Sequence, residues 1–282
     1  MTSAARAAPE EAKKQTALGE TIEVAKTVIY ALAIALVLRI LLFQPFTIPS
    51  ASMEPTLLQG DYIIVSKYSY GYSRHSIPFS PAIFDGRIFG RMPARGDVIV
   101  FKLPNDGHTD YIKRLVGLPG DKMQVRNGVL HINGKPVERR PLAAGSTETP
   151  MGPMPVGRVQ ETLPNGKRYV TYDMGDRPAD NTAVYTVPAG CFFLMGDNRD
   201  NSVDSRFNPG HVADRHAAET CPWNPSADIL ADPQAGVGFV PADNLVGKAE
   251  LILLSWYPEA SLFKPWTWFT EARPSRFFRI LH

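Results

Sequence analysis

Two serines in a stiff setting are the first residues of this 282-residue chain that suggest chemistry. Ser50 and Ser52 lie in the stretch FTIPSASMEPTL, between Pro49 and Pro55. Proline fixes its own φ and restricts the residue before it, so this stretch has little conformational freedom. A rigid, exposed turn would hold a nucleophilic hydroxyl at a defined angle to a carbonyl carbon. The alternative is that these serines only stabilise a turn, as most serines near proline do.

A serine nucleophile needs a base, and histidine oriented by a carboxylate is the usual one. None of the six histidines has a distinctive setting. They are His75, His108, His131, His211, His216 and His282. The sequence therefore gives no indication of a Ser-His-Asp triad.

A buried lysine is the other candidate base, because burial disfavours the ammonium form and lowers its pKa. Lys113 lies in the otherwise apolar run DYIKRLVGLPGD. Strand alternation there puts Tyr111, Lys113 and Leu115 on one face, and Ile112, Arg114 and Val116 on the other. An edge or solvated lysine on the strand is the structural alternative.

The stretch GDNRDNSVDSR is too polar for a strand and too dense in hydrogen-bonding groups for an ordinary linker. An Asx-rich turn would explain it, whereas an EF-hand calcium loop would need a central Gly and a terminal Glu that it lacks. Ser202 could orient a buried lysine, and an ion pair between Asp204 and Arg206 could brace the loop.

The elements that must position these residues are mostly strands, because the apolar runs are short, rich in Val, Ile, Tyr and Phe, and bounded by turn residues. The runs are DYIIVSKY, GDVIVFKL, DYIKRLVGL, GVLHING, KRYVTYDM, CFFLMGD and NLVGKAELILL. The Asn-Gly pair of HINGKP predicts a tight hairpin turn. Residues 69–95 and 207–236 are looser and are candidate surface insertions.

One segment departs from globular composition. Residues 22–43 are apolar except for Glu23, Lys26, Thr27 and Arg39 near the two ends. At about 1.5 Å per residue this run would span about 33 Å, close to the thickness of a hydrocarbon core. A buried core helix and a cleaved signal peptide are the alternatives, and we predict a retained anchor at 22–44.

The anchor divides the chain into a short tail, residues 1–21, and an exported β domain, residues 45–282. Basic residues precede or begin the span, which by the positive-inside rule puts the tail in the cytoplasm. They are Arg6, Lys13, Lys14 and Lys26. Arg39, near the other end of the span, weakens this asymmetry of basic residues.

Composition excludes some partners. A net charge of +2 and a pI of about 8.5 give no large basic field, so a nucleic-acid partner is not expected. Two cysteines, Cys191 and Cys221, rule out a disulfide framework and leave either one bridge or two buried thiols.

Together these stretches resemble bacterial type I signal peptidases, or leader peptidases, a family of Ser-Lys dyad serine proteases. IPSASMEPTL resembles the family's nucleophile box, GDVIVF its following strand, DYIKRLVGLPGD its lysine box and GDNRDNSVDSR its last signature. The resemblance implies a membrane-bound endopeptidase with a mostly antiparallel β fold.

The resemblance also implies residue roles. Ser52 would be the nucleophile, Lys113 its general base, and Ser50 a hydroxyl of the oxyanion hole beside the Ser52 N–H. Ser202 would orient Lys113, while Asp204 and Arg206 would hold the surrounding structure. The residues implied as walls of shallow pockets for small side chains are Ile48, Met53, Leu57, Tyr111 and Ile112.

By the same resemblance the chain would remove signal peptides from exported preproteins, after Ala-X-Ala-like sites, through an acyl-enzyme and without cofactor or metal. The expected location is the bacterial inner membrane, with the catalytic domain outside. Signal peptides, the lipid bilayer and the secretion translocon are the expected partners. A C-terminal aromatic set suits the headgroup zone or, equally, a domain core. Its members are Trp256, Phe263, Trp266, Trp268 and Phe269.

Two features depart from the family pattern. Many members have two spans where this chain has one, and about 30 residues follow Arg206 where members pass almost directly to a Gly-Phe-Val-Pro-like stretch. Cys221 in that insertion could form a disulfide with Cys191, and the acidic and histidine residues of the insertion could bind a metal, although a surface loop without a function of its own is favoured.

The alternative functions are a dedicated conjugation or pilus-type processing peptidase, a self-cleaving repressor-like protease, and an inert membrane-tethered binding module.

Overall fold

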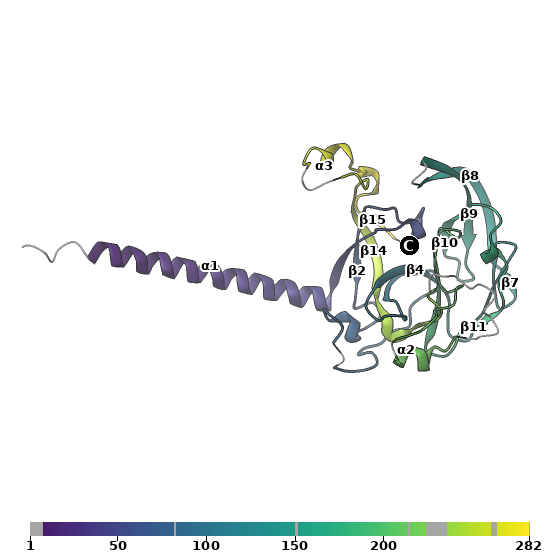
Figure 1. The fold of residues 1–282 in the computed structure, drawn as a ribbon, viewed down its shortest axis with the longest axis horizontal. Coiled ribbons are helices and arrows are strands. Elements are labelled where there is room, and N and C mark those ends of the chain that lie inside the picture. Colours follow the sequence, from purple (N-terminus) through teal and green to yellow (C-terminus); the bar gives the residue numbers. More distant parts are fainter. Residues whose placement is uncertain are drawn as a thin grey trace, which may run out of the picture.

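A long N-terminal helix projects from a β-rich body in the computed structural model (Figure 1). The structure describes residues 8–81, 83–149, 152–213, 215–223, 236–260 and 264–281. Helix α1 (Ala8–Leu41) carries exposed side chains from Gly19 onward, and this part is long and apolar enough to cross a membrane. The helix ends before the predicted boundary at 44, because Phe43 already belongs to strand β1.

The main sheet contains eight strands, in the order β1-β2-β14-β3-β4-β12-β13, with β15 paired to β14. They are β1 (Phe43–Thr47), β2 (Asp61–Ser66), β3 (Val98–Lys102), β4 (Asp110–Gly117), β12 (Cys191–Met195), β13 (Val240–Pro241), β14 (Leu245–Ser255) and β15 (Arg279–Ile280). All of their pairings are antiparallel, which confirms the predicted mostly β, antiparallel fold.

Two smaller antiparallel sheets complete the body, in the orders β10-β9-β8 and β11-β5-β6-β7. Their strands are β5 (Lys122–Arg126), β6 (Val129–Ile132), β7 (Lys135–Pro136), β8 (Glu138–Thr149), β9 (Gly152–Thr162), β10 (Arg168–Asp173) and β11 (Tyr185–Thr186). The predicted hairpin turn joins β6 to β7, and both Asn133 and Gly134 have positive φ, as a tight primed turn requires.

Each of the seven apolar runs noted in the sequence contains a strand of these sheets, because their alternating side chains fill cores on opposite faces. On β3, Val98 and Val100 enter one cluster of buried side chains, and Ile99 and Phe101 enter another. Because β4 pairs with β3 in register, each β4 residue faces the same side of the sheet as its β3 partner.

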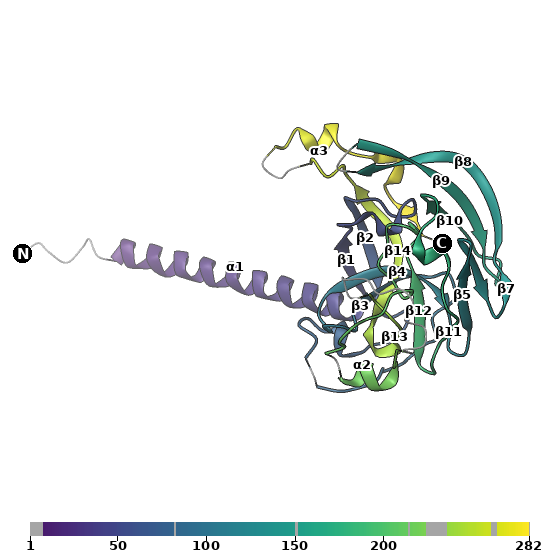
Figure 2. The same cartoon turned by 45° about the vertical axis from the view of Figure 1, so that its right-hand side comes forward.

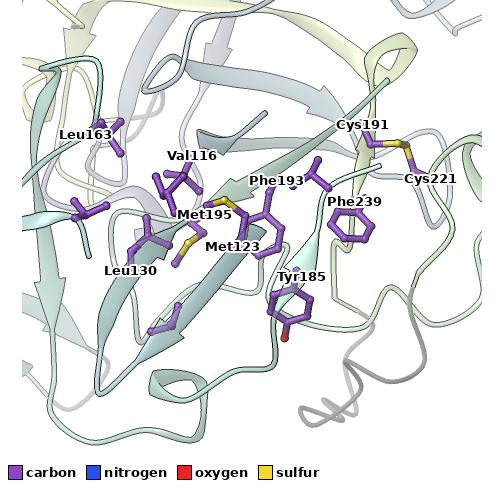
Figure 3. Close-up of a cluster of buried hydrophobic side chains, with 14 of the residues drawn as sticks. Val116, Met123, Leu130, Leu163, Tyr185, Cys191, Phe193, Met195, Cys221 and Phe239 are labelled. Atoms are coloured by element: carbon purple, nitrogen blue, oxygen red, sulfur yellow. A yellow bond between two sulfur atoms is a disulfide. The ribbon is translucent and has the colours of Figure 1, made fainter. Parts of the chain in front are cut away.

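A third core cluster lies between the main sheet and the β5-β6 hairpin (Figure 3). Its aromatic members Tyr185, Phe193 and Phe239 pack ring against ring. The disulfide between Cys191 and Cys221 closes one edge of the cluster, so the pairing that the sequence left open is formed. It ties β12 to the segment after helix α2 (Arg215–Thr220).

The long hairpin formed by β8 and β9 was not predicted from the sequence. It curves along one side of the body (Figure 2), and its segment PLAAGSTETPMGPMPVGR contains four prolines and no regular apolar alternation. The remaining short helices are η1 (Ala51–Met53), η2 (Arg74–Ser76), η3 (Pro178–Asp180), η5 (Ala242–Asn244), α3 (Thr267–Thr270) and η6 (Pro274–Arg276).

The two looser segments contribute no strand to the three sheets within their described residues. The first, 69–95, holds η2, and the second, 207–236, holds α2. Most of the second segment's C-terminal half, residues 224–235, lies outside the described residues.

Candidate active site

Ser52 and Lys113 meet across the fold although 61 positions separate them in sequence. Lys113 Nζ lies 2.7 Å from Ser52 Oγ, within hydrogen-bonding distance. The short helix η1 presents the serine, and the interior of β4 presents the lysine. A hydroxyl and an amine at this distance can exchange a proton directly.

The predicted exposed turn around the serine is wrong in one respect, because Ser52 is only 8% exposed. Lys113 covers it from one side, and the loop after β12 covers it from another. In that loop the Asn198 N–H donates to the Ser52 carbonyl at 3.1 Å, and the Asn198 side chain donates to the Ala51 carbonyl at 3.2 Å. Asn198 thus holds two adjacent carbonyl groups of the turn.

Burial decides the acid-base state of the lysine. Lys113 is 3% exposed, and this burial lowers its pKa to about 8, against the opposing pull of the Asp204 and Asp197 carboxylates. The Tyr111 ring lies 5.3 Å from the ammonium group. Relative to an ordinary lysine with a pKa near 10.5, the neutral form becomes far more accessible at neutral pH.

Ser50 places a second hydroxyl beside the first. Its Oγ lies 3.3 Å from Ser52 Oγ, and unlike Ser52 it is exposed. A hydroxyl at this position can donate to an oxygen that develops negative charge next to the attacking serine.

A buried carboxylate organises the loop after β12. Asp204 accepts hydrogen bonds from the Gly196 N–H and the Ser202 hydroxyl, both at 3.0 Å, and pairs with Arg206 at 2.9 Å. Burial opposes ionisation, but the Arg206 guanidinium and these hydrogen bonds hold the pKa of Asp204 below its usual range. Ser202 therefore donates to Asp204, and the expected direct orientation of Lys113 by Ser202 stays a prediction.

Glycine at position 196 is required by this packing. A Cβ there would lie 2.2 Å from Ser202 Oγ and 2.5 Å from the Ser52 carbonyl oxygen. Distances so short do not occur between real atoms, so a side chain at Gly196 would push apart the loop and the serine turn.

A second buried ion pair was not identified from the sequence. Arg114, next to the base on β4, binds both carboxylate oxygens of Asp197, at 2.8 and 2.7 Å. Thr56, four residues after Ser52, donates to the same carboxylate at 2.5 Å. The bidentate pair locks β4, the serine turn and the loop together. The only sequence signal was the Lys-Arg pair inside an apolar run.

Four of the five predicted pocket residues gather in one buried cluster. They are Ile48, Met53, Leu57 and Ile112. Tyr111 instead packs with Leu115 and Phe101 in the cluster on the other face of the sheet, as strand alternation predicts. Tyr111 is half-buried, and its ring faces the Lys113 ammonium.

Histidine does not replace the lysine within the described part of the chain. There, no histidine hydrogen-bonds to Ser52 or Lys113. The His75 ring accepts from Arg74 Nε, and His131 Nδ1 lies 2.9 Å from the Val129 carbonyl. The side chain of His216 and all of His282 lie outside the described residues.

The family model and the sequence relatives agree with one another. The model of a family described as signal peptidase, peptidase S26, matches residues 21–256. Signal peptidase I of Rickettsia typhi is 39% identical over 272 residues, covering 90% of this chain and 91% of that protein. Signal peptidase I of Rickettsia felis is also 39% identical over 272 residues, covering 90% of each. A crystal structure of a signal peptidase I from Enterococcus faecalis shares 22% identity at a TM-score of 0.28, covering 56% of this chain and 97% of that one.

Proposed function

Because the chain belongs to the signal peptidase family, peptidase S26, and is thus a serine protease, we propose that Ser52 and Lys113 form its catalytic dyad. In this proposal the protein removes N-terminal signal peptides from exported preproteins. The observation that carries it is the 2.7 Å contact between Lys113 Nζ and Ser52 Oγ in a buried setting.

The first chemical step requires a neutral lysine. With a pKa of about 8, about a tenth of Lys113 is neutral at pH 7, against well under 1% for an ordinary lysine. Neutral Nζ takes the proton of Ser52 Oγ as that oxygen attacks the carbonyl carbon of the scissile bond. The resulting ammonium then gives the proton to the leaving amine, and an acyl-enzyme on Ser52 remains.

In the second step, water is the nucleophile and Ser52 Oγ is the leaving group. Lys113, neutral again, takes a proton from a water molecule that attacks the acyl carbonyl, and Ser52 Oγ leaves with the proton. Ser50 Oγ, exposed and 3.3 Å from Ser52 Oγ, donates to the oxyanion in both steps, together with the Ser52 N–H.

Specificity for small side chains fits the apolar surroundings of the serine turn. Ile48 precedes the turn and Ile112 precedes the base, and both are buried in the same cluster as Met53. A substrate lying along these residues would find little open volume, which favours cleavage after an Ala-X-Ala-like site and disfavours bulky side chains.

The site lies close to the anchoring helix along the chain. Ten residues separate the serine from the last residue of α1, so α1 in a membrane would keep Ser52 near the surface, where a signal peptide emerges.

Exposed aromatic side chains lie at the same end of the body, since Trp266 is 63% and Phe269 85% exposed. Helix α3, which contains Phe269, lies at the end from which α1 projects (Figures 1 and 2). We propose that both face the outer leaflet, with the N-terminus in the cytoplasm.

The function is tested with the full-length protein in detergent, a secretory preprotein with an Ala-X-Ala site, and mass analysis of the products. Wild type should release the mature chain at that site, and Ser52→Ala should not. Ser275→Ala, an exposed serine in η6, is the matched control and should cleave as wild type does. A wild type that leaves several different preproteins intact would instead support a dedicated substrate or the inert binding module.

A further inference from the structure

A cavity separate from the dyad lies where α1 joins the body. Its volume is about 370 Å³, within the range of about 300 to 1,000 Å³ typical of small-molecule sites. Leu36 and Arg39 of α1 form one wall, and Lys67, at the end of β2, forms another. The proposed peptidase mechanism uses none of these residues.

Positive charge exceeds negative charge in this cavity. Arg39, Lys67 and Lys102 line it together with a single carboxylate, Asp110. That carboxylate pairs with Lys102 at 2.9 Å. Within the described residues no ion pair is formed by Arg39 or Lys67, so three cationic groups and one carboxylate leave an excess of two positive charges at the cavity.

Lys67 is the unusual member of the set, because it is almost fully buried. Its Nζ donates to the Ser76 carbonyl at 2.6 Å, and burial together with the nearby Arg39 charge lowers its pKa to about 8, against the opposing effect of the Asp110 carboxylate. A buried ammonium that forms no ion pair of its own is costly. An anion in the cavity would offset that cost and complete the coordination of both cations.

The cavity also lies at membrane level if α1 spans the bilayer. Arg39 is in the last turn of the helix, and the Tyr72 hydroxyl donates to the Leu41 carbonyl at 2.7 Å. The segment after β2 therefore lies against the end of α1, as both ribbon views show (Figures 1 and 2). An anion at this depth comes most directly from the headgroup layer.

Apolar groups border the charged ones. Phe79 lines the cavity and is 99% exposed, with a φ of 66°, a conformation uncommon for a bulky residue. Leu36 lies one turn before Arg39 on the helix. An exposed phenyl ring and a helical leucine beside two cations suit acyl chains attached to a phosphate and would not be needed for a free ion.

We propose that this cavity binds the phosphodiester of an anionic phospholipid of the outer leaflet, held by Arg39 and Lys67, with its acyl chains along Leu36 and Phe79. Arginine and lysine are the usual partners of phosphate oxygens in proteins and at membrane surfaces. The bound lipid would fix the angle between α1 and the body. This inference depends on α1 lying in the membrane and is independent of the peptidase activity.

The test places the full-length protein in nanodiscs of phosphatidylcholine and phosphatidylglycerol in equal amounts. Native mass spectrometry after detergent release identifies the lipids that stay bound. Wild type should retain phosphatidylglycerol in preference to phosphatidylcholine. Arg39→Gln and Lys67→Met should each lower that retention about tenfold, because each removes a hydrogen bond between charged groups.

Controls separate the site from general surface charge. Lys264 is exposed near α3 and outside the cavity, so Lys264→Gln should retain the lipid as wild type does. Equal retention of both lipids by wild type, or equal loss with Lys264→Gln, would overturn the proposal. Displacement of the lipid by millimolar inorganic phosphate would assign the site to the free ion. If Lys67→Met fails to fold, Arg39→Gln decides alone, and its wild-type retention would refute the site.

Discussion

We propose that Lys113 acts as a base because the fold buries it and leaves its ammonium form poorly solvated. The Asp204 and Asp197 carboxylates favour the charged form, but burial outweighs them and lowers the pKa to about 8. In this proposal, the burial that makes the neutral base accessible also lowers the stability of the folded state. The native state carries an ammonium that would be more stable in water.

This opposition predicts that Lys113→Met stabilises the protein. Below pH 8 both the folded and the unfolded wild type carry the charge, so the folded state bears the full cost of burying it. As pH rises from about 8 to 10.5 the folded lysine is neutral while the unfolded one still binds a proton, so wild-type stability rises relative to the variant. At pH 7 the gain in free energy of unfolding should be about 1 to 3 kcal/mol.

Thermal unfolding in detergent, followed by circular dichroism at several pH values, measures this difference. The gain of Lys113→Met should be largest below pH 8 and shrink toward pH 10.5. A variant that is less stable than wild type at pH 7 would mean that Lys113 is not a destabilising buried charge.

At the scale of elements, sequence patterns predicted most strands whose apolar side chains fill the cores, but missed the alternating strand β5 and the β8-β9 hairpin. Strands β3, β4 and β12 were predictable because their Val, Ile, Leu and Phe residues fill cores. The β8-β9 hairpin was not, because its Pro- and Gly-rich strands lack apolar alternation and are ordered by pairing with each other and with β10 and by the buried pair of Glu161 with Arg199. The first two residues of strand β1, Phe43 and Gln44, were assigned to the anchor, since FQPFT continues the apolar run.

Of the candidate site, too, only part could be predicted from the sequence. Ser52 and Lys113 could be proposed from the sequence because long motifs carry them, and they stay a prediction. The bidentate pair of Arg114 with Asp197 was missed because it forms only when β4 and the loop after β12 come together. Residue types in one stretch cannot specify such a partner 83 positions away.

The disulfide ties a peripheral segment to β12 and should contribute stability without contributing to catalysis. It closes a loop with a sequence separation of 30. Restricting an unfolded loop of that length is worth about 2 to 4 kcal/mol. Replacing both Cys191 and Cys221 with Ala should lower the free energy of unfolding by that amount. Preprotein cleavage below the unfolding temperature should be retained.

Urea unfolding of the double variant and of wild type, with and without reductant, measures the loss. Reductant should lower wild-type stability to that of the variant and leave the variant unchanged. Identical unfolding midpoints for oxidised wild type and variant would contradict a stabilising role of the bridge.

For the whole molecule, we propose that α1 and the exposed aromatics around α3 set how the body lies on the membrane. Trp266 lies at the surface, whereas Trp223 packs in the third core cluster, with its ring 5.4 Å from those of Tyr185 and Phe239. A body that rests on the bilayer would bring Trp266 to the headgroup zone and keep Trp223 away from lipid.

Quenching of tryptophan fluorescence by lipids brominated near the headgroup tests this orientation in proteoliposomes of the full-length protein. Trp266→Phe should remove a large part of the quenched signal, and Trp223→Phe should leave it unchanged. Equal effects of the two substitutions would mean that the α3 end does not contact the membrane.

The rate of preprotein cleavage by wild type and by Lys113→Met across pH tests the dyad most directly. For wild type, kcat/KM should rise about tenfold per pH unit below pH 8 and level off above it, because the neutral lysine is the active form. Lys113→Met should lose activity by about a hundredfold or more at every pH, while the exposed-lysine control Lys122→Met keeps the wild-type profile. Cleavage by Lys113→Met at the wild-type rate would show that Lys113 is not the base.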